Sequence, residues 1–171
     1  MVKTYSRPTR VVVIAVVGCV LAACNSNQQS DSRSKTSPHA QHKVAGRDLG
    51  VDESRGGHTL RKHVGRSDED LRTRLRRERE IAAASTYTDR HTAETFIAAC
   101  LDDNEGRVRE WLAQDRHPNL AIDCVGDPAW PIGRSLRRGQ SEPEPCSDAN
   151  LVLKWIAPSD YFVLTSYPDC R

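Results

Sequence analysis

The chain has 171 residues, which is enough for one domain of ordinary size. Lys and Arg total 25 while Asp and Glu total 23, so the formal net charge is only +2. This near balance excludes attraction of a polyanion by overall charge, and an anionic partner must therefore meet a local basic patch.

The N-terminus has the pattern of an export signal. Three basic residues among the first ten precede an apolar run over residues 11–23, which is shorter than the roughly 20 residues of a spanning helix. The run ends in Leu-Ala-Ala-Cys and resembles the lipobox of bacterial lipoproteins. The resemblance implies a signal peptide over residues 1–23 and lipid on Cys24; the alternative is a plain secretory signal with an incidental cysteine. Asn25 follows Cys24, whereas an aspartate at that position would resemble an inner-membrane retention signal. We therefore expect sorting to the outer membrane.

Residues 24–55 are rich in Ser, Gln, Asn, His and Lys, with few large apolar side chains. Such a segment buries too little surface to offset the entropy lost on ordering. We therefore expect a flexible linker here, followed by one domain over residues 56–171.

The domain contains four cysteines, an even number that favours two disulfides in an oxidising compartment. They are Cys100, Cys124, Cys146 and Cys170. No CxxC pair occurs among them, which argues against a structural zinc site. Three connectivities are possible, and we favour Cys100–Cys170 with Cys124–Cys146, because the second pair would close a loop-rich segment.

Helices are predicted in the first half of the domain. Ser67 can cap a helix whose first turn is acidic, and Leu71, Leu75 and Ala82, with Ile81 beside them, form its apolar stripe. A second helix starts at Asp89 or Thr92, and a third covers about 105–114.

Strands are predicted in the second half, where the hydrophobic period changes to two. The candidates are 119–125, 131–137, 151–157 and 161–167, with a polar loop over 138–149. The short Pro-Ser-Asp link between the last two strands predicts an antiparallel hairpin. Helices followed by antiparallel strands indicate an α+β fold.

The last strand carries Thr165 and Tyr167, which strict alternation places on one face together with Val163. Two hydroxyl groups on a rigid strand can bind a phosphate or an oxyanion. The alternative is a solvated Thr–Tyr pair on a half-exposed sheet.

His58 and His63 are five residues apart, so on a helix they would lie about 140° apart and would not share a site. Either ring can transfer protons near neutral pH, although a surface or capping role is the alternative. Arg74 is either a salt-bridged surface residue or a fork directed at phosphate.

These segments together resemble one known family. The motifs are GGHTLRKHVG at residues 56–65, SDEDL at 67–71, Arg74-Leu75, Ala84-Ser85-Thr86, Thr92-Ala93-Glu94, Trp111-Leu112 and YFVLTSYP at 161–168. They resemble the bacterial RNase A-like toxin domain found at the C-termini of contact-dependent inhibition proteins. The resemblance implies an RNase A-like α+β fold, with N-terminal helices on a curved antiparallel sheet.

The resemblance also implies an endoribonuclease that needs no metal or other cofactor and cleaves RNA, commonly tRNA, to a 2′,3′-cyclic phosphate. His63, Arg74, Thr165 and Tyr167 match the catalytic residues of the family, and His58 is a possible further participant. DNA lacks the required 2′-hydroxyl. We expect an interbacterial toxin, held to the membrane by lipid on Cys24, with a cognate immunity protein as its partner. The competing hypothesis is a non-catalytic envelope lipoprotein whose RNase-like domain binds a protein or an anionic ligand.

Overall fold

The computed structural model describes residues 46–170, so the signal segment, Cys24 and most of the expected linker lie outside the described residues. The helices are α1 (Leu49–Ser54), α2 (Thr59–His63), α3 (Asp68–Arg77), α4 (Arg90–Asp103) and α5 (Glu105–Leu112). The strands are β1 (Ala83–Tyr87), β2 (Leu120–Cys124), β3 (Gly133–Arg137), β4 (Glu144–Cys146), β5 (Asp148–Ala157) and β6 (Asp160–Asp169). Within residues 46–170, none of the helices has the length and apolar character needed to cross a bilayer.

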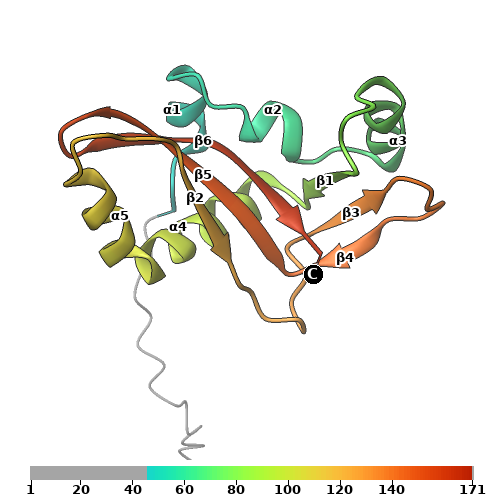
Figure 1. Cartoon of the computed structure of the whole chain (residues 1–171). Helices are drawn as coiled ribbons and strands as arrows, with labels where there is room; N and C mark the ends of the chain where they lie inside the picture. The colour runs from blue at the N-terminus through green and yellow to red at the C-terminus, as the bar shows by residue number, and fades with distance from the viewer. Residues whose placement is uncertain (1–45, 171) are drawn as a thin grey trace, which may run out of the picture. The chain divides into compact units, whose positions relative to one another are not determined.

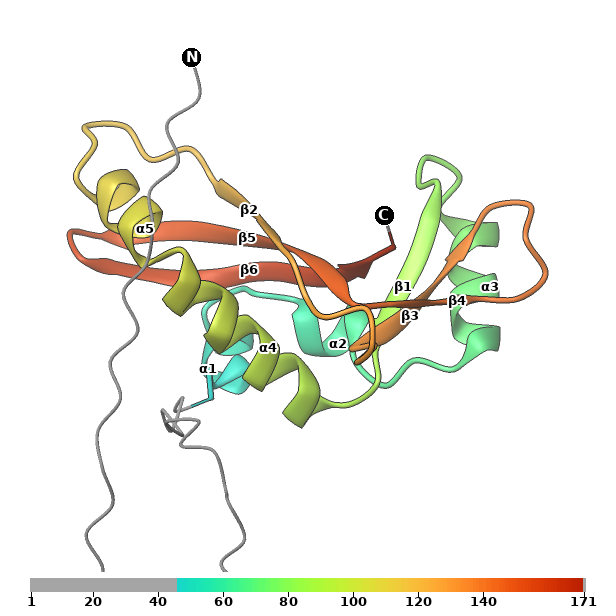
Figure 2. The ribbon, with the colours of Figure 1, turned by 90° about the horizontal axis from the view of Figure 1, so that it is seen from below.

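Two antiparallel sheets of three strands each organise the domain, in the orders β1-β3-β4 and β2-β5-β6. Figure 1 shows α1 and α2 on one side of the β5–β6 hairpin and α4 and α5 on the other. Figure 2, seen from below, shows α4 running obliquely past the hairpin in front of α1, with α3 beside the other sheet. The α+β fold predicted from the sequence is confirmed, with two sheets rather than one continuous sheet.

The larger hydrophobic core lies between the helices and the β2-β5-β6 sheet, and Ile97, Ile122, Leu151 and Leu153 are fully buried in it. A smaller core joins α3 to the other sheet. Its buried residues are Leu71, Leu75, Ala84 and Leu136. The site described below lies where α2, α3, β1 and β6 meet, beside both cores.

The sequence predicts a linker up to residue 55, but the last part of that segment is folded into the domain. Residues 49–54 form α1, whose Leu49 is fully buried in the larger core. Asp52 is only 2 % exposed, pairs with Arg47 at 2.6 Å and accepts the Val163 N–H at 3.0 Å. One apolar and one fully satisfied acidic side chain anchor a segment whose average composition is that of a linker.

Helix α3 begins as predicted, with a reciprocal capping box between Ser67 and Asp70. It ends at Arg77, earlier than expected, because the following Glu78 has non-helical dihedral angles. Ile81 and Ala82 are therefore not part of its apolar stripe; they lead into β1 instead. The helices predicted from Asp89 and from residue 105 are confirmed as α4, which Asp89 caps, and α5.

Two strands were missed. β1 covers Ala83–Tyr87, and β4 lies within the segment 138–149 that was expected to be a loop. β4 pairs with β3, with Pro145 opposite Arg134, and it lies at the edge of its sheet, where proline is tolerated. Only three residues long, it gives no periodic signal in the sequence.

The β5–β6 hairpin is confirmed, but it contains a bulge that changes which side chains share a face. Val152 pairs with Thr165 and Leu153 pairs with Val163, so Leu164 is an extra residue in β6. Val163 is fully buried in the larger core, whereas Thr165 and Tyr167 line a pocket. The expectation that Val163 shares the face of Thr165 is therefore wrong.

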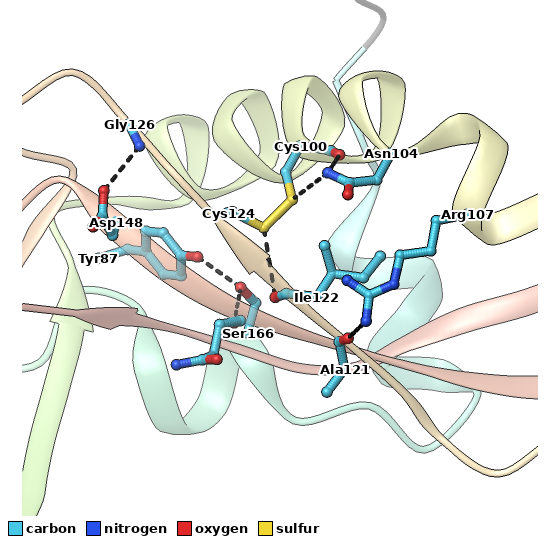
Figure 3. Close-up of a disulfide and its surroundings, with 11 residues drawn as sticks. Tyr87, Cys100, Asn104, Arg107, Ala121, Ile122, Cys124, Gly126, Asp148 and Ser166 are labelled. Carbon is cyan, nitrogen blue, oxygen red and sulfur yellow. Dashed lines mark hydrogen bonds between the residues drawn. A yellow bond between two sulfur atoms is a disulfide. The ribbon is translucent and has the colours of Figure 1, made fainter. Parts of the chain in front are cut away.

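The disulfides are Cys100–Cys124 and Cys146–Cys170, so the favoured connectivity is wrong. Figure 3 shows the first bond joining α4 to β2. The second bond follows from the hairpin register. Because Asp148 pairs with Asp169, Cys146 and Cys170 come together just beyond the open end of the hairpin.

Candidate active site

A short segment before and within α2 is hydrogen bonded to β6 on both sides of Thr165. The His58 N–H donates to the Leu164 carbonyl at 3.0 Å, and the Thr59 hydroxyl accepts the Ser166 N–H at 2.9 Å. Thr59 is 2 % exposed, so this hydroxyl is the buried partner of the Ser166 amide. The two bonds fix the histidine segment against the strand that carries both predicted hydroxyl groups.

Gly57 permits this close approach. A Cβ atom at residue 57 would lie 2.6 Å from the Val163 carbonyl oxygen and 2.8 Å from that of Asp52. Both neighbours are backbone atoms and cannot give way, so a larger residue would push α2 off the strand.

Ser166 is held from its other side as well. Its hydroxyl group lies 2.7 Å from the Tyr87 hydroxyl and donates to the Asn150 carbonyl at 2.8 Å, as Figure 3 shows in part. Tyr87, on β1, is fully buried. This contact ties β1 to β6, so that the strands forming two walls of the site are fixed to each other.

His63, the last residue of α2, is 6 % exposed. Its Nδ1 lies 3.3 Å from the Ser85 carbonyl oxygen on β1 and 3.4 Å from Arg74 Nη1. The carbonyl can only accept a hydrogen bond and is the nearer of the two atoms, so we assign the proton to Nδ1. Arg74 can only donate, so its contact with Nδ1 is then not a hydrogen bond. Nε2 then carries the lone pair and is the atom that can accept a proton.

Burial and the neighbouring Arg74 cation lower the pKa of His63 to about 3, the burial effect being the larger. The ring is therefore neutral at physiological pH. A neutral imidazole with one nitrogen fixed is suited to accept a proton from a substrate.

Arg74 projects from α3 toward His63 and is half-buried, with a side-chain exposure of 21 %. Its Nε donates to Glu78 at 3.2 Å, one helical turn further along. Glu78 thus orients the guanidinium group, while the rest of the fork remains available for a second acceptor.

Thr165 and Tyr167 complete the site from β6. The Tyr167 ring lies 5.4 Å from the His63 ring, measured between centroids. Thr165 Oγ1 is buried and has no hydrogen-bond partner among the described residues. A buried hydroxyl group without a partner is costly, and it is satisfied when a ligand supplies an acceptor.

One pocket of about 440 Å³ contains all these groups. It is lined by His58, His63, Arg74, Ile81, Ala82, Ala83, Ser85, Thr165 and Tyr167. The four residues predicted from the sequence therefore meet, although up to 104 positions separate them in the chain (63 to 167). Sequence reasoning missed Ser85, whose contribution is a backbone carbonyl and leaves no signal in residue type.

His58 shares this pocket, contrary to the expectation from helical spacing. Helix α2 starts at Thr59, so His58 lies before its first turn, and the His58 and His63 ring centroids are 6.3 Å apart. Burial, followed by Lys62 and Arg61, lowers the pKa of His58.

Among residues 46–170, no three His, Cys, Asp or Glu side chains form a set of metal ligands.

Comparison with known proteins identifies the family. The model of the bacterial CdiA-CT RNase A domain matches residues 57–168, which include every residue of the pocket. The chain belongs to the bacterial CdiA-CT RNase A domain family. This confirms the resemblance inferred from the sequence and places the chain among toxin nuclease domains.

A solved CdiA-CT chain is similar in structure. The crystal structure of a CdiA-CT/CdiI complex from Y. kristensenii 33638 superposes with a TM-score of 0.60 at 29 % identity. The match covers 66 % of this chain and 99 % of that chain. No curated protein matches the sequence. Helix α1 and Cys170 lie outside the residues matched by the CdiA-CT family model.

The low pKa of His63 predicts acid sensitivity. Its pKa of about 3 in the folded domain lies below the value near 6.5 of an unfolded histidine. At pH values between these two pKa values, the unfolded chain therefore binds more protons than the folded one. The free energy of unfolding should fall as the pH drops below 6.5, by on the order of 2 kcal/mol at pH 5. Urea unfolding at pH 7 and pH 5 measures this. In His63→Gln the pH dependence should be flatter, and equal slopes would refute the assignment.

The Thr59 bond to β6 predicts a second effect. Thr59→Val keeps the side-chain shape but leaves the buried Ser166 N–H without an acceptor, at a cost of about 1–3 kcal/mol. Hydrogen exchange of the Ser166 amide should accelerate together with the loss of stability. Thr95→Val, at an exposed position of α4, is the control. If both variants behave alike, the Thr59 bond does not hold α2 to β6.

Proposed function

We propose that the domain is a metal-independent endoribonuclease that cleaves RNA, with tRNA as its target, and acts as an interbacterial toxin. The observation that carries the proposal is a neutral, buried His63 facing Arg74 and the unpartnered Thr165 hydroxyl in one pocket. Membership of the CdiA-CT RNase A family supports the same reaction class.

The first half-reaction is a transphosphorylation within the substrate. The ribose 2′-oxygen attacks the adjacent phosphorus and its proton passes to His63 Nε2. The bond from phosphorus to the 5′-oxygen breaks, leaving a 2′,3′-cyclic phosphate, and the 5′-oxygen takes a proton from the Tyr167 hydroxyl or from the imidazolium form of His58. Because the nucleophile belongs to the RNA, the reaction requires no metal-activated water, and DNA is not a substrate.

Charge on the non-bridging oxygens is stabilised by Arg74 and by the Thr165 hydroxyl. The hydroxyl group lies on a rigid strand and has no partner to give up, so it is already oriented for a developing oxyanion. Bound phosphate would also neutralise the Arg74 charge that lowers the pKa of His63. Substrate binding would thus raise the basicity of His63 when a base is needed.

Cleavage of a tRNA pool in the presence of EDTA tests the proposal, using the chain from residue 24 with Cys24→Ser to keep it unlipidated. His63→Ala should lower the rate by about 10²–10⁴-fold, and Thr165→Val by about 10²-fold. His91→Ala and Thr95→Val, at exposed positions of α4, are matched controls. Intact RNA with the wild type, or equal cutting by His63→Ala, contradicts the proposal. RNA binding without cleavage would favour the non-catalytic alternative.

We also propose that the toxin domain is exported on a chain anchored by lipid at Cys24 in the outer membrane. The lipobox-like sequence supports this, and two disulfides in the domain are typical of an oxidising compartment. Labelled palmitate should be incorporated by the wild type and not by Cys24→Ser, which should appear in the soluble fraction. Incorporation of equal label would refute lipidation at Cys24.

A cognate immunity protein is the expected protein partner. Its support is the similar chain, which was crystallised in a CdiA-CT/CdiI complex.

A further inference from the structure

We call the pocket that contains His63, Arg74, Thr165 and Tyr167 the catalytic pocket. A second hollow lies beside it, and we call this hollow the α2–α3 groove. Its volume is about 290 Å³, and its charged walls include Arg61, Lys62, Arg66, Arg74, Arg77 and Glu78. Arg74 also lines the catalytic pocket, so the two hollows adjoin at this residue. A chain leaving the catalytic pocket past Arg74 therefore enters the groove.

The acidic side chains of the groove are already engaged. Asp70 accepts hydrogen bonds from the Ser67 amide and hydroxyl in the capping box, and Glu78 pairs with Arg74. These two carboxylates offset two of the five cations that line the groove, which are Arg61, Lys62, Arg66, Arg74 and Arg77. The groove therefore has an excess of positive charge although the whole chain is close to neutral.

Two of the cations have no partner within residues 46–170. Lys62 and Arg77 are exposed and make no ion pair or side-chain hydrogen bond there, in contrast to Arg61, which pairs with Glu53 at 2.8 Å. Arg66 holds its guanidinium group in place by donating to the Leu60 carbonyl at 3.2 Å, while its Nε lacks an acceptor. Unpaired ammonium and guanidinium groups that line one groove are suited to bind phosphate oxygens.

We propose that the α2–α3 groove binds a phosphate of the RNA next to the one that is cleaved, with Lys62 and Arg77 as its principal ligands. This inference rests on the proposed ribonuclease function and extends it to the substrate. Continuity through Arg74 favours a nucleic-acid strand, since successive phosphates of one strand would occupy the two hollows in order. The groove's walls are charged and lack the exposed aromatic anchors typical of protein interfaces.

The groove predicts how cleavage depends on substrate length. A dinucleoside monophosphate has only the phosphate that is cleaved and cannot reach the groove. A longer RNA with the same cleavage sequence has a neighbouring phosphate and gains binding energy from it. Loss of groove cations should therefore raise KM for the longer RNA while kcat stays close to that of the wild type.

The test compares the double variant Lys62→Ala/Arg77→Ala with Arg109→Ala/Arg116→Ala, which removes the same charge from exposed positions outside the groove. The substrates are a dodecanucleotide with the cleavage sequence mapped on tRNA and the matching dinucleoside monophosphate. The groove variant should lose roughly tenfold in kcat/KM on the dodecanucleotide, mainly through KM, and should match the wild type on the dinucleotide.

Binding of a dodecanucleotide with 2′-O-methyl groups at every ribose separates this proposal from the proposed function, because that RNA cannot be cleaved and requires no mapped cut site. The slope of log K against log salt concentration should be smaller by about 0.7 per lost phosphate contact in the groove variant. Equal salt slopes for the wild type and the groove variant, or equal losses of kcat/KM on the two substrates, overturn the groove proposal. The groove would then be left with an acidic protein surface as its candidate ligand. If the slopes of the wild type and the groove variant differ as expected but the wild type cleaves no RNA, the ribonuclease function alone is refuted.

Discussion

The whole site depends on two hydrogen bonds on either side of Thr165, from the His58 amide to Leu164 and from the Ser166 amide to the Thr59 hydroxyl. They join the beginning of the domain to its last strand, about a hundred residues away in sequence. Without them, the site residues of α2 and those of β6 would lie on independent elements. Catalytic geometry tolerates errors of only about 0.5 Å, so rigid attachment through the backbone matters more here than any single side-chain contact.

The electrostatics of the pocket involve a compromise. Arg74 is placed to meet an anion, yet its charge adds to the burial that makes His63 a weak base. Glu78 partly offsets the positive charge of Arg74 through their ion pair, and it does not line the pocket that contains His63. The histidine is thus kept neutral, and its basicity responds to the charge of what binds beside it. Such coupling between a bound phosphate and a base requires no movement of the backbone.

Much of the architecture was predictable from local patterns, because capping residues and hydrophobic periodicity act over a few positions. The capping box at Ser67 and the final hairpin were found in this way. The bulge at Leu164 was not, since it depends on how β6 fits α2 and the core rather than on its own sequence. Helix α1 was missed because a single buried leucine and a buried Asp–Arg pair outweigh a polar average composition.

The four candidate site residues came from the family resemblance, whereas their spacing alone left them ambiguous. The pairing of Cys146 with Cys170 could have been derived from the predicted hairpin by continuing its register beyond Asp148 and Asp169. The role of the Ser85 carbonyl could not, because every residue has one and only the fold selects it.

The second disulfide has a topological consequence. Cys146 and Cys170 are separated by 24 positions, and the bond between them closes the β5–β6 hairpin into a covalent ring that contains Thr165 and Tyr167. Cys100–Cys124 closes a second ring of equal sequence separation. A polypeptide with two such rings cannot pass through a narrow pore as a single extended thread. Each ring must be reduced first, or the pore must be wide enough for two strands side by side.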